Sequence, residues 1–110
     1  MGAFGAHGLR NRLEGLADGA QRMAWWQTGA QYHLVHALAL AAVALAWPKA
    51  GGTLLAISGW SFVAGTLLFS GSLYVMTLTG VRALGAVTPL GGLAFILGWL
   101  MLGLAAWRSA

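Results

Sequence analysis

The chain has 110 residues, of which 59% are hydrophobic and only 7% are charged. Soluble domains carry about 25% charged residues, so this composition excludes an ordinary water-soluble surface and predicts one membrane domain over residues 1–110. The formal net charge of +4 comes from cations scattered through the loops, which is typical of membrane topology signals and argues against nucleic acid as a partner.

The segment before the first long apolar run mixes apolar and basic residues. Its apolar residues recur at spacings of three and four, the period of one helix face: Leu9, Leu13, Leu16, Ala20 and Met23. This period is compatible with an amphipathic helix in the membrane interface. Gly15 and Gly19 interrupt the segment, and we favour a polar loop.

Three segments lack charge for long enough to cross a bilayer, which takes about 20 residues. They cover residues 23–47, 53–79 and 83–107. Only short links separate them, so neighbouring spans must run antiparallel. Because lipid offers no hydrogen bonds to the backbone, and because the apolar runs are continuous rather than alternating, we predict helices.

Aromatic residues mark the two edges of the first span. Trp26 lies about 21 residues before Trp47, or roughly 32 Å along a helix, close to the thickness of the hydrocarbon layer. Asp18 followed by Gln21 resembles a capping box, which predicts that this helix starts near Gly19.

The third span contains Pro89, and the sequence is compatible with two positions for it. In one, Pro89 kinks a single long helix; in the other, it lies in the first turn of a helix that follows a short interfacial segment. We favour the kink because residues 90–107 extend only roughly 27 Å as a helix, which is short for a tilted span.

Cations are distributed unequally between the two sides of the predicted bundle. One side carries four: Arg10, Arg12, Arg22 and Arg82. The other side carries two: Lys49 and Arg108. Cytoplasmic loops are enriched in cations, so we predict a cytoplasmic four-cation side and an extracytoplasmic C-terminus.

Small residues recur along each span at helical spacing, which predicts seams of close helix packing. The predicted packing residues are Ser58, Ser61, Gly65, Ser72, Gly91, Ala94 and Gly98. A comparable row in the first span contains His33, Ala37, Ala41 and Ala44. The bulky residues are expected to face lipid or a partner: Leu67, Phe69, Phe95, Leu100 and Leu102.

Histidines are the candidate ligands for a cofactor. His33 and His36 lie within the first span and His7 precedes it, so a metal or haem site is conceivable. We favour neutral histidines that hydrogen-bond to a neighbouring helix, because His33 and His36 share one helix and both carboxylates lie outside the spans. The prediction is no cofactor and no metal.

Two other polar groups invite a functional interpretation. Ser70 and Ser72 would need His36 within hydrogen-bond reach to act as nucleophiles, and we interpret them as a packing notch instead. Arg82 lies in a tight turn, where it either determines topology or contacts a lipid head group or a partner. The chain is therefore expected not to be an enzyme.

Five motifs occur in a characteristic order along the chain. They are GAFGAHGL at 2–9, WQTGAQY at 26–32, FSGSLY at 69–74, LTGVR at 78–82 and TPLGG at 88–92. Together they closely resemble the YgdD/YwdK-type family of small membrane proteins, a family of unknown function. The resemblance implies a four-helix bundle in a bacterial inner membrane. Family members have a transmembrane helix ahead of the first motif, so here either the true start lies upstream or the chain has three spans.

We therefore predict an all-α membrane protein with three transmembrane helices in an antiparallel bundle, preceded by a short interfacial segment. The predicted role is a non-enzymatic accessory or scaffold subunit that packs against a larger membrane complex or against itself. The alternatives are a small oligomeric transporter or channel, and a haem- or metal-linked redox subunit. Membrane lipids are the other expected partners.

Overall fold

The computed structural model describes residues 8–109. Its elements are α2 (Arg10–Leu13), α3 (Gly19–Ala50), α4 (Thr53–Gly65), the π-helical turn η2 (Thr66–Ser70), α5 (Gly71–Thr79), the 3-10 turn η3 (Arg82–Ala86) and α6 (Thr88–Ser109). Three helical stretches are long and apolar enough to cross a membrane, residues 19–50, 53–79 and 82–109. The predicted all-α fold with three candidate membrane helices is confirmed.

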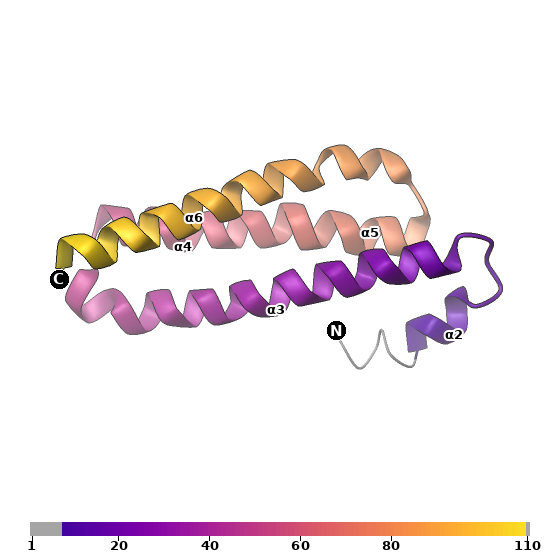
Figure 1. The fold of residues 1–110 in the computed structure, drawn as a ribbon, viewed down its shortest axis with the longest axis horizontal. Coiled ribbons are helices and arrows are strands. Elements are labelled where there is room, and N and C mark those ends of the chain that lie inside the picture. Colours follow the sequence, from indigo (N-terminus) through magenta and orange to yellow (C-terminus); the bar gives the residue numbers. More distant parts are fainter. Residues whose placement is uncertain (1–7, 110) are drawn as a thin grey trace.

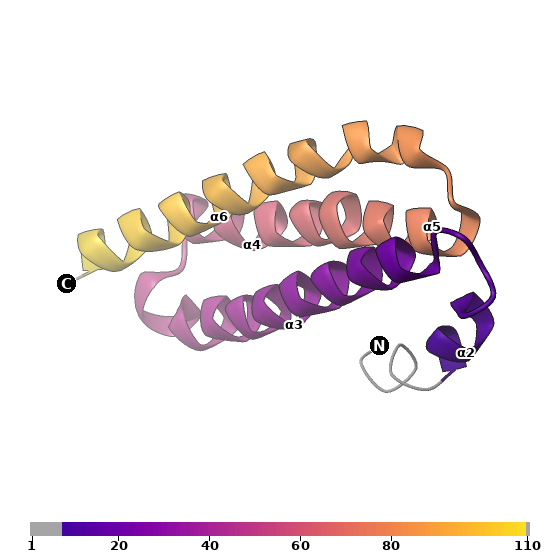
Figure 2. The same cartoon turned by 45° about the vertical axis from the view of Figure 1, so that its right-hand side comes forward.

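The helices form a narrow antiparallel bundle that extends 53 × 27 × 14 Å (Figure 1). The second span, made of α4, η2 and α5, occupies the middle in both ribbon views, with α3 on one side and α6 on the other (Figure 2). Helix α4 packs chiefly against α6, and α5 packs chiefly against α3. The middle span is therefore the one that holds the other two together.

Glycines allow the two reversals of the chain between spans. Gly52 has a φ of +145° and ends the link between α3 and α4. Gly80 has a φ of +73°, and its backbone N–H donates to the carbonyl oxygen of Met76 at 2.7 Å, which caps α5. Side chains other than glycine rarely adopt these φ values, so both turns depend on residues without a Cβ atom.

Pro89 lies in the first turn of α6, which begins at Thr88 after the 3-10 turn η3. The prediction of a kink within one long helix is therefore wrong. A proline in the first helical turn loses no hydrogen bond, because the N–H groups there have no partner within the helix. The nearly continuous helical stretch 82–109 still reaches the length of a tilted span.

The segment before α3 is not the polar loop that we favoured. It folds back beneath α3 as the short helix α2 (Figure 1). Leu9 and Leu13 are buried in a cluster with Trp26, whereas Leu16 is exposed. The loop prediction failed because two leucines four residues apart can cover the large indole surface of a neighbouring helix.

The predicted packing residues occupy the following positions. Six are buried, namely Ser58, Ser61, Gly65, Ser72, Gly91 and Gly98, and Ala94 is half-buried. Leu68, which shares the helical spacing of the second-span row, is exposed. The π-helical turn η2 contains more residues per turn than an α-helix, which shifts the register of the buried face. Ser70 is therefore buried in place of Leu68.

Two expectations about the orientation of side chains were wrong. In α3 the residues Ala37, Ala41 and Ala44 are exposed, and the buried row contains His36, Ala39 and Val43. Phe95, expected to face lipid, is buried. The two errors are linked, because the buried row of α3 places His36 against the ring of Phe95, with ring centroids 3.5 Å apart.

Candidate functional site

His36 is the buried polar centre of the bundle, with 3% of its surface exposed. Its Nδ1 lies 2.7 Å from the backbone oxygen of Tyr32, one turn earlier in α3. The indole N–H of Trp99 on α6 donates to its Nε2 at 3.0 Å. A carbonyl accepts and an indole donates, so the two contacts match the tautomer that carries its proton on Nδ1.

Aromatic rings enclose His36. Phe95 stacks on the imidazole with ring centroids 3.5 Å apart, and Phe62 lies at 5.6 Å. Two glycines leave room for these rings, since a Cβ at Gly98 would come within 2.6 Å of the Phe62 ring and one at Gly65 within 2.4 Å of the Phe95 ring. The small residues of the seams therefore accommodate rings as well as backbone.

His33 points to a different neighbour. Its Nδ1 lies 3.0 Å from the hydroxyl of Tyr74 on α5, and the Tyr74 ring packs on Trp26 at 4.5 Å. His36 bonds instead to α6 through Trp99. The two histidines therefore face different helices, and both nitrogens of His36 already have partners. This arrangement does not fit a shared metal or a haem.

The third candidate ligand, His7, lies outside the described residues. Among residues 8–109 no group of three or more His, Cys, Asp or Glu side chains has the arrangement of a metal site.

The serines of the second span bond to backbone and to threonine rather than to a histidine. Ser70 donates to the carbonyl oxygen of Gly29 at 2.8 Å. Ser72 donates to the carbonyl oxygen of Phe69 at 2.9 Å and lies 2.5 Å from the hydroxyl of Thr88. These hydroxyls join α3, the middle span and α6, so the geometry is that of interhelical hydrogen bonding.

Arg22 holds the end of α5, a role that the sequence did not reveal. Its Nε donates to the backbone oxygen of Thr77 at 2.7 Å, and the Thr77 hydroxyl donates back to the backbone oxygen of Arg22 at 3.0 Å. Asp18 lies 3.6 Å from the guanidinium. A cation at the C-terminus of a helix also complements its dipole. Arg22 was counted only as a topology signal because its partner is 55 residues away.

Arg82 is exposed and joins the same end of the bundle. It donates to the side-chain oxygen of Gln21 at 2.8 Å, and its guanidinium lies 5.5 Å from the centre of the Trp25 ring. The side-chain oxygen of Gln21 therefore accepts a hydrogen bond from Arg82, and the Asp18 side chain makes no capping hydrogen bond to α3. The capping box that the sequence predicted is therefore wrong, although α3 does begin at Gly19.

The outer face of α3 carries two exposed amides, Gln27 and Gln31, one helical turn apart. Neither makes a hydrogen bond to another described residue. Exposed alanines precede them on the same face, at Ala20 and Ala24. We call the four residues the α3 outer face. Sequence reasoning missed it, although two glutamines four residues apart in an uncharged span are a visible signal.

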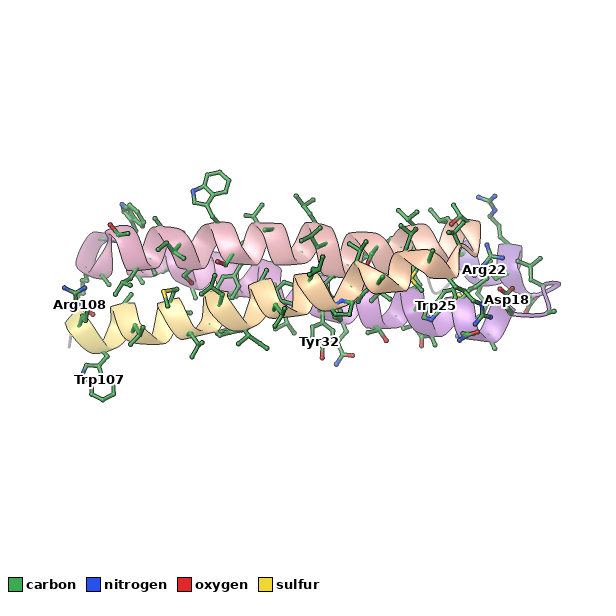
Figure 3. All side chains as sticks on the ribbon, turned by 90° about the horizontal axis from the view of Figure 1, so that it is seen from above. Asp18, Arg22, Trp25, Tyr32, Trp107 and Arg108 are labelled. Atoms are coloured by element: carbon green, nitrogen blue, oxygen red, sulfur yellow. The ribbon has the colours of Figure 1, made fainter. Side chains whose placement is uncertain are left out.

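A hollow of about 430 Å³ adjoins the α3 outer face at its N-terminal end. Three of the four outer-face residues line it, namely Ala20, Ala24 and Gln27. The rest of the lining comes from α2, from the residue after it and from the start of α3: Arg10, Leu13, Glu14, Gly19 and Met23. Figure 3 places Asp18, Arg22 and Trp25 at this end of the bundle and Trp107 and Arg108 at the opposite end.

Comparison with known proteins gives consistent matches. A family model described as "Protein of unknown function (DUF423)" matches residues 1–92. UPF0382 membrane protein YwdK of Bacillus subtilis is 46% identical over 107 residues, which cover 96% of this chain and 83% of the relative. UPF0382 inner membrane protein YgdD of Escherichia coli is 39% identical over 108 residues, covering 98% of this chain and 79% of the relative. No solved structure matches.

Proposed function

The chain belongs to the DUF423 family of membrane proteins, and we propose that it is a non-enzymatic accessory subunit packing against a larger complex of the bacterial inner membrane. The observation that carries this proposal is the α3 outer face, where two amides lie exposed on a helix of membrane-spanning length. The inner-membrane location is proposed from the printed name of the relative YgdD.

The position of the amides along α3 makes them costly in lipid. Gln27 lies about one residue beyond Trp26, and Gln31 lies about five residues beyond it, or roughly 8 Å further along the helix axis. If Trp26 marks the interface, Gln31 is within the hydrocarbon, where an amide without a partner is unfavourable. A polar side chain from a neighbouring helix would satisfy it, at a gain of about 1 kcal/mol.

Small side chains leave the N-terminal end of the same face open. Ala20 and Ala24 are exposed there and precede Trp26, so they belong to the interfacial turns of α3 if Trp26 marks the interface. Beyond Trp26 the amides themselves are the feature typical of a helix interface, because hydrogen-bonding side chains connect helices inside membranes. The partner is therefore expected to present a transmembrane helix with its own polar side chain at the level of Gln31.

The geometry gives less support to the redox alternative. A haem or metal ligand needs a free imidazole nitrogen, and both nitrogens of His36 are occupied by Tyr32 and Trp99. His33 bonds through Nδ1 to Tyr74 on another helix, so the two histidines do not form a shared site. The oligomeric alternative uses the same α3 outer face with a second copy as the occupant. An experiment on that face therefore separates the two remaining possibilities.

Site-specific photocrosslinking in native membranes tests the proposal. A photoreactive phenylalanine derivative replaces Gln31 in one variant, and in the control it replaces Leu100, which is 58% exposed on α6. We expect the Gln31 position to crosslink to one larger membrane protein and the Leu100 position to give no such product. A product of twice the 11.4 kDa chain would instead identify a homo-oligomer.

A second variant tests whether the amides are responsible. Gln27→Leu combined with Gln31→Leu removes both hydrogen-bonding groups but keeps the helix and its apolar character. We expect the double variant to remain folded and to leave the larger complex on a native gel. Retention of the complex by this variant would contradict the role assigned to the α3 outer face.

A further inference from the structure

A second cavity lies at the other end of the bundle from the α3 outer face. It has a volume of about 420 Å³ and lies between the link from α3 to α4 and the end of α6. Its lining includes Lys49, Gly52, Thr53, Leu54 and Arg108. Its size is within the range of sites for small ligands.

Two cations converge on this cavity from different helices. Lys49 comes from the last turn of α3 and Arg108 from the last turn of α6. Neither forms an ion pair with another described residue. The only acidic side chains of the chain are Glu14 and Asp18. Glu14 lines the hollow at the start of α3, and Figure 3 shows Asp18 at that same end of the bundle, so no carboxylate side chain of the described residues neutralises the cavity.

The backbone adds donors to the same space. Thr53 and Leu54 line the cavity and form the first turn of α4, where N–H groups have no partner within the helix. The N-cap residue Gly52 has no side chain to satisfy them. Two cations and the first turn of α4 therefore line one cavity, and an oxyanion is the ligand class that can satisfy both the cations and the free N–H groups.

Two tryptophans place the cavity at the surface of the membrane. Trp47 and Trp107 are 50% and 81% exposed, and each lies within two residues of one of the cations. Exposed tryptophans at the ends of membrane helices are typical of the interface, where phospholipid head groups lie. The head group of an anionic lipid would therefore reach the cavity without leaving the bilayer.

We propose that this cavity, between Lys49 and Arg108, binds the phosphate group of an anionic phospholipid. The guanidinium and the ammonium contact the phosphate oxygens, and the first-turn N–H groups of α4 donate to them. A zwitterionic lipid carries a phosphate too, but its positively charged ammonium group would lie against two cations, so the site favours lipids with net negative charge.

The test measures lipid binding to the full chain purified in a neutral detergent. Native mass spectrometry gives the occupancy with phosphatidylglycerol, with phosphatidylcholine and with phosphatidylglycerol plus inorganic phosphate. We expect Lys49→Gln combined with Arg108→Gln to weaken phosphatidylglycerol binding by about tenfold or more. The control, Arg10→Gln combined with Arg12→Gln, removes the same charge at the other end and is expected to change binding less than about twofold.

A conservative variant separates charge from folding. Lys49→Arg combined with Arg108→Lys keeps both charges and is expected to retain phosphatidylglycerol selectivity, with unchanged helicity by circular dichroism in all variants. Equal binding of phosphatidylcholine, or equal losses in the two glutamine variants, would overturn the proposal. Displacement of the lipid by millimolar inorganic phosphate would overturn the lipid as ligand and identify the free ion instead.

Discussion

His36 lies about halfway between Trp26 and Trp47, so its ring is near the middle of the predicted membrane helix. A polar group at that depth must be satisfied by the protein itself. Its two hydrogen bonds and its stacking on Phe95 do this, and the bond from Trp99 and the stacking connect α3 to α6. His36 therefore acts as an interhelical joint in the described structure.

The hydrogen bond from Trp99 to His36 leads to a prediction at this scale. Trp99→Phe keeps an aromatic ring but leaves Nε2 of His36 without a donor. We expect the free energy of unfolding to fall by about 1–3 kcal/mol, the cost of a buried unsatisfied polar group. Unfolding in a titration of sodium dodecyl sulfate, followed by circular dichroism, measures this change.

The control uses the same substitution at an exposed position. Trp107 is 81% exposed, so Trp107→Phe is expected to leave the unfolding midpoint nearly unchanged. Equal destabilisation by the two substitutions would show that the hydrogen bond to His36 does not contribute to stability.

The helices differ in how closely they pack. Gly98 of α6 and Phe62 of α4 meet so closely that a Cβ atom would lie 2.6 Å from the ring. Ser58 adds a hydrogen bond of 2.7 Å to the carbonyl oxygen of Gly98. Close steric fit and an interhelical hydrogen bond thus occur at the same residue, so we expect the contact between α4 and α6 to be sensitive to substitution of Gly98.

A pair of matched substitutions on α6 tests this contact. Gly98→Ala forces the Phe62 ring to move, and we expect a loss of about 1–3 kcal/mol in the free energy of unfolding. Gly103→Ala places its methyl group where no atom lies within 4 Å, so stability should be unchanged or slightly higher. The same detergent titration compares them, and equal effects would contradict the close crossing.

At the scale of the whole molecule, the two ends of the bundle differ in charge. The end that contains α2 and the link between α5 and α6 carries four cations, and the other end carries Lys49 and Arg108. We propose from this difference that the four-cation end is cytoplasmic. The proposed phosphate site would then lie at the extracytoplasmic surface.

Reporter fusions test the orientation. A reporter that is active only in the periplasm is expected to be active when fused after Ala110, because the C-terminus would be extracytoplasmic. As the control, the same reporter inserted between α5 and α6, next to Gly80, is expected to be inactive. The reverse pattern of activity would invert the proposed topology.

Much of the architecture could be predicted from local composition. Charge-free runs and the exclusion of unsatisfied backbone from lipid determine that the chain folds into helices and how many can span a membrane. The interpretation of the histidines as neutral rests on the scarcity of acids and stays a prediction. The inference of helical spans succeeds because it depends on the bilayer as a solvent and not on which helix meets which.

The tertiary structure alone decided which face of α3 is buried. In α3 the alanine row and the row of His36 and Val43 both have helical spacing, and only packing against the rings of α4 and α6 selects the second. Arg22 found its partner Thr77 only through the fold. Period and composition are local properties, whereas burial depends on shape complementarity between residues far apart in the chain, which no short segment encodes.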